Sequence, residues 1–126
     1  MKSMKGFTLV ELVIVIVIVG ILSVVAVPVY KGYTKKAMAT EGKALLGAIN
    51  TSQKVYFAEW ANFATSAQSG SLDVDARTNK YFTTYTISGT ATGFTATTAG
   101  SGGATGIALT LTGSSTGASN ISEAGL

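Results

Sequence analysis

The residues that could do chemistry lie at the N-terminus, around one acid in an apolar setting. Glu11 is followed by an uncharged stretch of 19 residues, positions 12–30. A carboxylate in a membrane helix costs roughly 2.5–3.5 kcal/mol at the bilayer centre and less near the interface. We therefore expect Glu11 to take a positive partner. If the chain were cut after Gly6, the new amine on Phe7 of a neighbouring copy could supply that charge.

The same acid also has a local interpretation. Thr8-Leu9-Val10-Glu11 fits a capping box, with Thr8 at the N-cap and Glu11 at N3. The carboxylate would then bind backbone N–H groups of its own chain and would suit the positive end of the helix dipole. The sequence does not separate capping from a role in subunit assembly, and both can hold at different stages.

The element that positions these residues is predicted to be a membrane-spanning helix over residues 7–30. The 19 uncharged residues would span roughly 28 Å as a helix, close to the ~30 Å hydrocarbon thickness of a bilayer. A single segment in lipid can pair its backbone groups only as a helix. Lys2 and Lys5 would keep the N-terminus in the cytoplasm.

A cleaved secretory signal peptide fits this sequence poorly. Such a peptide places its small-residue cleavage site after the apolar stretch. No A-x-A pattern occurs near Ala26, and the plausible processing site, between Gly6 and Phe7, precedes the apolar run. Cleavage there would remove residues 1–6 as a leader and leave the anchor on the mature chain.

Two residues in or near the apolar run weaken a helix. Pro28 lacks an N–H and is expected to kink or break the helix ahead of it, and Gly20 lowers helix propensity by ~1 kcal/mol relative to Ala. Gly and Pro are also tolerated in membrane helices without any special role.

Residues 31–63 are predicted to continue as an amphipathic helix. One apolar stripe at helical spacing is expected to face the core. Its members are Tyr30, Tyr33, Ala37, Ala44, Ala48, Val55 and, less regularly, Ile49. Gly42 and Gly47 weaken this helix, but no proline interrupts it.

Three lysines follow the apolar run, namely Lys31, Lys35 and Lys36. Snorkelling to lipid headgroups accounts for them most simply. A basic patch also attracts nucleic-acid phosphates, but this one is small, and a nucleic-acid partner is not expected.

Residues 64–126 are predicted to form a small head, which makes the fold class α+β. After a loop at 64–80, strand patterns occur at 81–88, 94–98 and 107–112, which suits a three-stranded antiparallel sheet packed on the helix. The Gly/Ser/Thr-rich tail from Gly113 is predicted to be irregular.

Composition excludes several kinds of chemistry. The 126 residues include no Cys and no His, so disulfides, thiolate nucleophiles and the commonest zinc ligands are absent. Asp73 and Asp75 are too few carboxylates for a calcium loop without further oxygen ligands. No cofactor is expected, and with no convergent acid, base and nucleophile, an enzyme is the least expected class.

The run Lys5-Gly6-Phe7-Thr8-Leu9-Val10-Glu11 resembles the N-terminus of type IV pilins and their relatives, the pseudopilins. The resemblance implies that a prepilin peptidase cuts after Gly6 and methylates Phe7. It also implies that Glu11 helps an incoming subunit to join the filament, and we assign Thr8 to subunit assembly together with Glu11. Many pilins close a C-terminal loop with a disulfide, and this chain departs from that pattern.

The resemblance further implies that the segment between Gly20 and Pro28 can soften in the filament. It predicts a homo-oligomeric helical filament, assembled from the bacterial inner membrane by a platform protein and an ATPase complex. The filament would reach the cell surface or span the periplasm.

Two alternatives remain open. A pseudopilin of a type II secretion system would share every N-terminal feature. Major pseudopilins usually carry an acidic calcium loop near the C-terminus, where this chain offers only Glu123, so the pilus is slightly favoured. From a different class, the chain could be a single-anchor membrane protein that binds a ligand without polymerising.

Overall fold

The computed structural model describes residues 5–126, which form an α+β chain with one long helix and one antiparallel sheet. The elements in order are α1 (Leu9–Trp60), η1 (Ser66–Leu72), β1 (Thr86–Gly89), β2 (Gly93–Ala99), η2 (Gly102–Ala104), β3 (Ala108–Ser114) and β4 (Ser119–Ala124). The chain divides after Thr34 into an N-terminal unit and a C-terminal unit, called the head below.

In the N-terminal unit, the β-branched run is helical, as a segment without strand partners should be. Pro28 lies inside α1, and the predicted break there is not observed, since α1 continues past it without interruption. The Ser23 hydroxyl donates a hydrogen bond to the Val19 carbonyl at 2.7 Å. The polar atom of this side chain is thereby satisfied within the helix, as an apolar environment requires.

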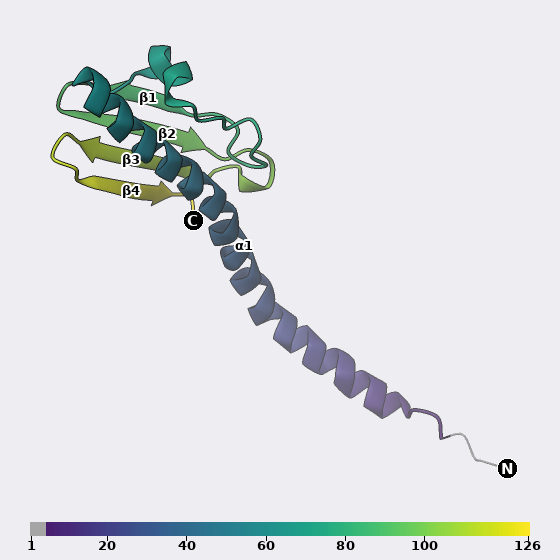
Figure 1. Ribbon diagram of the computed structural model, residues 1–126. Helices are drawn as coiled ribbons and strands as arrows, with labels where there is room; N and C mark the ends of the chain where they lie inside the picture. Colours follow the sequence, from purple (N-terminus) through teal and green to yellow (C-terminus); the bar gives the residue numbers. More distant parts are fainter. Residues whose placement is uncertain (1–4) are drawn as a thin grey trace. The chain divides into compact units, whose positions relative to one another are not determined.

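The head contains a four-stranded sheet, with strand order β1-β2-β3-β4 and every pair antiparallel. The head portion of α1 lies across one face of this sheet (Figure 1). The prediction of three strands was therefore one short. The fourth strand comes from the tail that was predicted to be irregular.

The tail forms a strand because a tight turn returns it alongside β3. The Ser114 N–H donates to the Ala118 carbonyl at 2.9 Å, and Gly117 supplies a left-handed φ of 92° in the turn. Along β4 only Ile121 is a partly buried apolar residue, and its neighbours are exposed and polar. The alternation of apolar and polar residues is therefore too weak to be recognised in the sequence.

The first predicted strand, 81–88, was too long, since the strand begins only at Thr86. Its predicted start is bound to the helix instead. The Glu41 carboxylate on α1 accepts hydrogen bonds from the backbone N–H groups of Tyr81, at 2.6 Å, and Phe82, at 3.0 Å. These N–H groups are therefore not available to a neighbouring strand.

The helix face that packs on the sheet also differs from the predicted stripe. Of the predicted residues Ile49 is buried, whereas Tyr30, Tyr33, Ala37, Ala44, Ala48 and Val55 are exposed. The buried residues of α1 are Ala39, Gly42, Leu45, Leu46, Ile49 and Gln53. The two leucines bring more apolar area to this face than alanines bring to the other, so the leucine face packs on the sheet.

Gln53 fixes the chain just after the helix. It is 0% exposed, and its side-chain amide donates to the Ala64 carbonyl and accepts from the Ala64 N–H, both at 2.8 Å. Beside it, the Ser66 hydroxyl accepts from the Ile87 N–H and donates to the Ile87 carbonyl. Ser66 therefore covers the outer edge of β1, which would otherwise present unpaired backbone groups.

Gly42 and Gly47 of α1 should respond differently to substitution by alanine. A Cβ at Gly42 would lie 2.5 Å from Leu109 and 3.0 Å from Phe82, both in the core, whereas a Cβ at Gly47 would meet nothing within 4 Å. We expect Gly47→Ala to stabilise the head by about 0.8–1.0 kcal/mol through helix propensity. Gly42→Ala should be neutral to about 2 kcal/mol destabilising, because overpacking costs roughly 1–3 kcal/mol.

Thermal unfolding of the full chain in detergent, followed by circular dichroism, would check this pair. A raised midpoint for Gly42→Ala would show that the helix does not pack on the sheet as closely as described.

Glu41 should make the stability of the head sensitive to acid. Partial burial would raise the pKa of Glu41, but the hydrogen bonds from the backbone N–H groups of Tyr81, Phe82 and Lys80 outweigh it and lower the pKa. A carboxylate with a lowered folded-state pKa contributes stability above its unfolded pKa, and this contribution is lost as the pH falls through the folded pKa.

We therefore expect Glu41→Gln to reduce stability at neutral pH by about 1 kcal/mol, because hydrogen bonds to charged acceptors are stronger than those to neutral ones. The variant should also lose less stability than the wild type as the pH falls below about 4.3, the ordinary pKa of a glutamate. Unfolding midpoints measured between pH 7 and pH 3 test this, with the exposed Glu59→Gln as the control. Parallel pH curves for Glu41→Gln and the wild type would contradict it.

Candidate functional site

The candidate cleavage site lies in extended chain just ahead of the helix. Lys5, Gly6 and Phe7 are exposed and outside regular structure, and the Phe7 side chain is 84% exposed. The Gly6–Phe7 peptide bond is thus accessible, as a peptidase would need. The start of the predicted leader, with Lys2, lies outside the described residues.

Thr8 and Glu11 form the predicted capping box. Glu11 Oε2 accepts from the Thr8 N–H and from the Thr8 hydroxyl, both at 2.9 Å, and the Glu11 N–H donates to Thr8 Oγ1 at 3.3 Å. Within residues 5–126, no hydrogen bond to Glu11 Oε1 is formed. The capping arrangement therefore uses one carboxylate oxygen and leaves the other accessible.

The helix that follows is apolar on every side. The large apolar side chains from Phe7 to Tyr30 are all between 44% and 84% exposed, so none of them packs in a core of this chain. Among the described residues, α1 is the helix long and apolar enough to cross a membrane. Such a surface is stable only when lipid or other apolar helices cover it.

The two predicted softening residues both lie within this helix. The space beside Gly20 is open, because a Cβ added to this residue would meet nothing within 4 Å. Pro28 lies two turns further on and cannot donate a hydrogen bond to the carbonyl of Val24. Pro28 thus removes one backbone hydrogen bond from α1, and Gly20 contributes only the lower helix propensity of glycine.

Lys31, Lys35 and Lys36, the lysines that follow the apolar run, are all exposed. In the head, Lys35 Nζ donates to the Gly125 carbonyl at 3.3 Å and so contacts the end of the chain.

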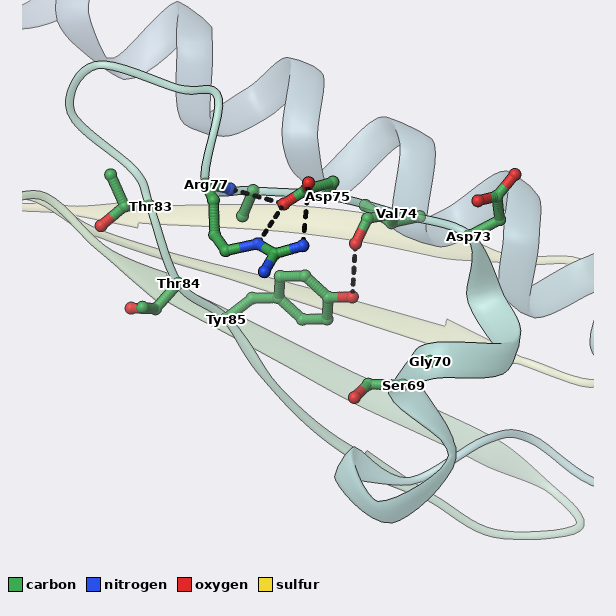
Figure 2. Close-up of a pocket in the computed structure, with 10 residues that line it drawn as sticks. Ser69, Gly70, Asp73, Val74, Asp75, Arg77, Thr83, Thr84 and Tyr85 are labelled. Carbon is green, nitrogen blue, oxygen red and sulfur yellow. Dashed lines mark hydrogen bonds and ion pairs between the residues drawn. The ribbon is translucent and has the colours of Figure 1, made fainter.

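A surface pocket of about 470 Å³ lies where the chain passes from η1 towards β1 (Figure 2). Arg77 there donates two side-chain hydrogen bonds to Asp75, at 3.0 and 3.2 Å, and the Tyr85 hydroxyl donates to the Val74 carbonyl at 2.9 Å. The side-chain and backbone hydrogen bonds from Arg77 lower the pKa of Asp75. Burial, with the nearby Asp75, raises the pKa of Tyr85.

The acids of this pocket do not converge. Asp75 forms an ion pair with Arg77. Asp73 lies apart from that pair at the end of η1 and has a left-handed φ of 50° (Figure 2). Among the described residues, no three His, Cys, Asp or Glu side chains are grouped as metal ligands would be.

Sequence reasoning missed the polar residues that hold the head together, Glu41 and Gln53. Gln53 bonds the backbone of Ala64, which lies 11 residues further on. Glu41 bonds the backbone of Tyr81 and Phe82, which lie 40 and 41 residues further on. Their positions on α1 gave no signal by themselves, because a polar residue on a helix is ordinarily solvated.

Comparison with known proteins addresses the N-terminal half. Residues 1–27 match the model of the prokaryotic N-terminal methylation motif. A fimbrial protein of Moraxella nonliquefaciens is 38% identical over 81 residues, which cover 64% of this chain and 53% of that protein. A type IV major pilin, PilE1 of Neisseria gonorrhoeae, is 44% identical over 66 residues, covering 50% of this chain and 40% of that protein.

A fimbrial protein of Pseudomonas aeruginosa is 39% identical over 67 residues, which cover 53% of this chain and 44% of that protein. The matched segments thus span about half the length of these relatives, and no solved structure gives a significant match. The resemblance to type IV pilins is thereby confirmed: the chain carries the prokaryotic N-terminal methylation motif and is similar, over half or more of its length, to fimbrial proteins and type IV major pilins.

Proposed function

We propose that this protein is the structural subunit of a type IV pilus-like helical filament. The observation that carries the proposal is the N-terminal arrangement. An accessible Gly6–Phe7 bond stands directly before a helix whose first turn holds Glu11 and whose surface is apolar on every side. The similarity to fimbrial proteins and major pilins over this segment supports it.

In this proposal a prepilin peptidase cuts after Gly6 and methylates the new terminal amine of Phe7. That amine is cationic and lies near the membrane interface. A neighbouring subunit's Glu11 is the acid that can neutralise it. Bringing the two together offsets the cost of holding either charge in an apolar surrounding.

Capping and assembly are compatible on this geometry. Glu11 Oε2 accepts both hydrogen bonds from Thr8, and Oε1 is left for the amine of the neighbour. Thr8 would then act as a positioning residue, because its bonds hold the carboxylate against the first turn of the helix. A carboxylate can accept several hydrogen bonds at once, so neither role displaces the other.

The exposed apolar surface of residues 7–30 supplies the force for assembly. In the inner membrane it is covered by lipid, and in a filament by the same segment of other subunits. Gly20 and Pro28 would let the helix between them extend as subunits pack. A head-to-tail contact that does not close into a ring propagates as a fibre from one kind of subunit.

An external machine would drive the assembly. The sequence holds no GxxxxGK[ST] phosphate-binding loop, so the work would come from an ATPase and a platform protein of the inner membrane. The finished filament would extend to the cell surface. In a type II secretion pseudopilus, the same processed chain would remain within the envelope.

Substitutions at Glu11 and Thr8 should separate assembly from capping. We expect Glu11→Ala to be cleaved and inserted into the membrane normally but to lower filament yield at least about tenfold, the factor that ~1.4 kcal/mol of lost interaction would give. Thr8→Ala should lower yield only a few-fold, because a lost N-cap costs ~1 kcal/mol and leaves the acid in place.

The measurement is the amount of subunit in sheared surface filaments relative to the processed subunit in the membrane, with Glu59→Ala in the head as the matched control. If capping were the whole role of Glu11, the two N-terminal variants would lose filaments equally. Normal yield from Glu11→Ala would sink the proposal that this acid drives assembly.

A further inference from the structure

Met38 is the one sulfur-containing residue among residues 5–126. The sequence holds no cysteine, and its other two methionines are Met1 and Met4. Cysteine and methionine carry the sulfur atoms that oxidants convert in defined steps, methionine to its sulfoxide. In the described part of the chain, this chemistry is therefore confined to a single thioether.

The Met38 side chain is both accessible and packed. It is partly buried against the core of the head, and it directly precedes Ala39, which is fully buried. A dissolved oxidant can reach a partly exposed thioether, and a change in its polarity is felt by the core against which it packs. An exposed methionine would meet only the first of these conditions, and a fully buried one only the second.

The sulfur lies close to η2 and to the ring of Tyr81. A Cβ added to Gly103 would lie 3.3 Å from Met38 Sδ and 3.5 Å from Tyr81 Cε1, so both atoms lie beside the same point of η2. Gly103 is itself exposed, and as a glycine it places no side chain over the sulfur. A thioether packs favourably beside an aromatic ring, so this contact holds η2 against α1.

Tyr81 joins separate segments of the head at this point. Its N–H donates to the Glu41 carboxylate on α1, and its carbonyl accepts from the N–H and the hydroxyl of Ser101, at 2.8 and 3.0 Å. Ser101 stands directly before η2 as its N-cap. The thioether of Met38 therefore packs where α1, Tyr81 and η2 meet.

Oxidation would change this contact without cutting the chain. The sulfur lone pair attacks one oxygen of hydrogen peroxide, a sulfur–oxygen bond forms and the O–O bond breaks. The sulfur-bound oxygen gives its proton to the departing hydroxide, which leaves as water. The thioether is thereby oxidised to the sulfoxide and the peroxide is reduced. The sulfoxide is polar and disrupts apolar packing, and methionine sulfoxide reductases convert it back to the thioether.

We propose that Met38 is a reversible modification site, at which a peroxide forms the sulfoxide and thereby loosens η2 from α1 and Tyr81. A sulfoxide oxygen needs hydrogen-bond donors, and burying it without them is costly. Water can reach this oxygen fully only when η2 or Tyr81 moves away from the sulfur. The head is then less stable, and reduction of the sulfoxide restores it.

Peroxide treatment of the full chain in detergent tests the proposal. We expect peptide mass mapping to find one added oxygen, about 16 Da, on the peptide that contains Met38. The thermal midpoint of the head should fall by about 4 °C or more, and hydrogen exchange of the amides in residues 101–105 should become several-fold faster. Methionine sulfoxide reductase should return both to their values before treatment.

Met38→Leu is the matched control, because leucine conserves the volume and carries no sulfur. Peroxide should leave the midpoint of this variant unchanged, even where it oxidises Met1 and Met4. Met38→Gln places a polar group at the same position without any oxidant, and it should start from the lowered midpoint. If Met38→Leu does not fold, the comparison of Met38→Gln with the untreated wild type carries the test.

Oxygen on Met38 with an unchanged midpoint would overturn the inference. Resistance of Met38 to peroxide that fully oxidises free methionine would overturn it as well. The same holds for an equal fall of the midpoint in Met38→Leu, or for a wild-type midpoint in Met38→Gln. Each result is read from the head in detergent, so it is independent of whether the chain forms filaments.

Discussion

The constraint on which the molecule depends is that residues 7–30 have nothing in their own chain to pack against. Every large apolar side chain there is exposed, while the backbone is paired internally as a helix. A helix of this kind must be covered by lipid or by copies of itself. In the proposed function, lipid covers this helix before assembly and copies of the same helix cover it in the filament core. In the proposed filament, the single acid near the start of the helix, Glu11, pairs with the N-terminal amine of a neighbouring subunit.

The head depends on the same helix for its stability. A four-stranded sheet without disulfides must gain its stability from one face of α1. Close approach at Gly42, the leucines that follow it, and the bonds from Glu41 and Gln53 attach three separate segments of the head to that face. The polar bonds fix where the irregular segments lie, and the apolar contacts supply most of the energy.

The sequence predicted the features that depend on interactions between residues close together in the chain. The apolar segment, the capping box of Thr8 and Glu11, the long helix and the class of fold follow from residue type and spacing. The strand at 119–124 escaped prediction because its pairing with β3 depends on a turn at Gly117 and its own alternation is almost entirely polar. The buried stripe of α1 was predicted on the wrong face of the helix, because alanines at helical spacing can face either the core or the solvent. The partner of a residue such as Glu41 lies 40 positions away, and only the folded head brings them together.

The central claim is that one chain is cut after Gly6 and then built into a filament. The most direct measurement is the intact mass and N-terminal sequence of the protein, taken separately from sheared surface filaments and from the membrane fraction. The account predicts a chain that begins with methylated Phe7 in long sheared fibres. A chain that still begins with Met1 in every fraction would contradict it.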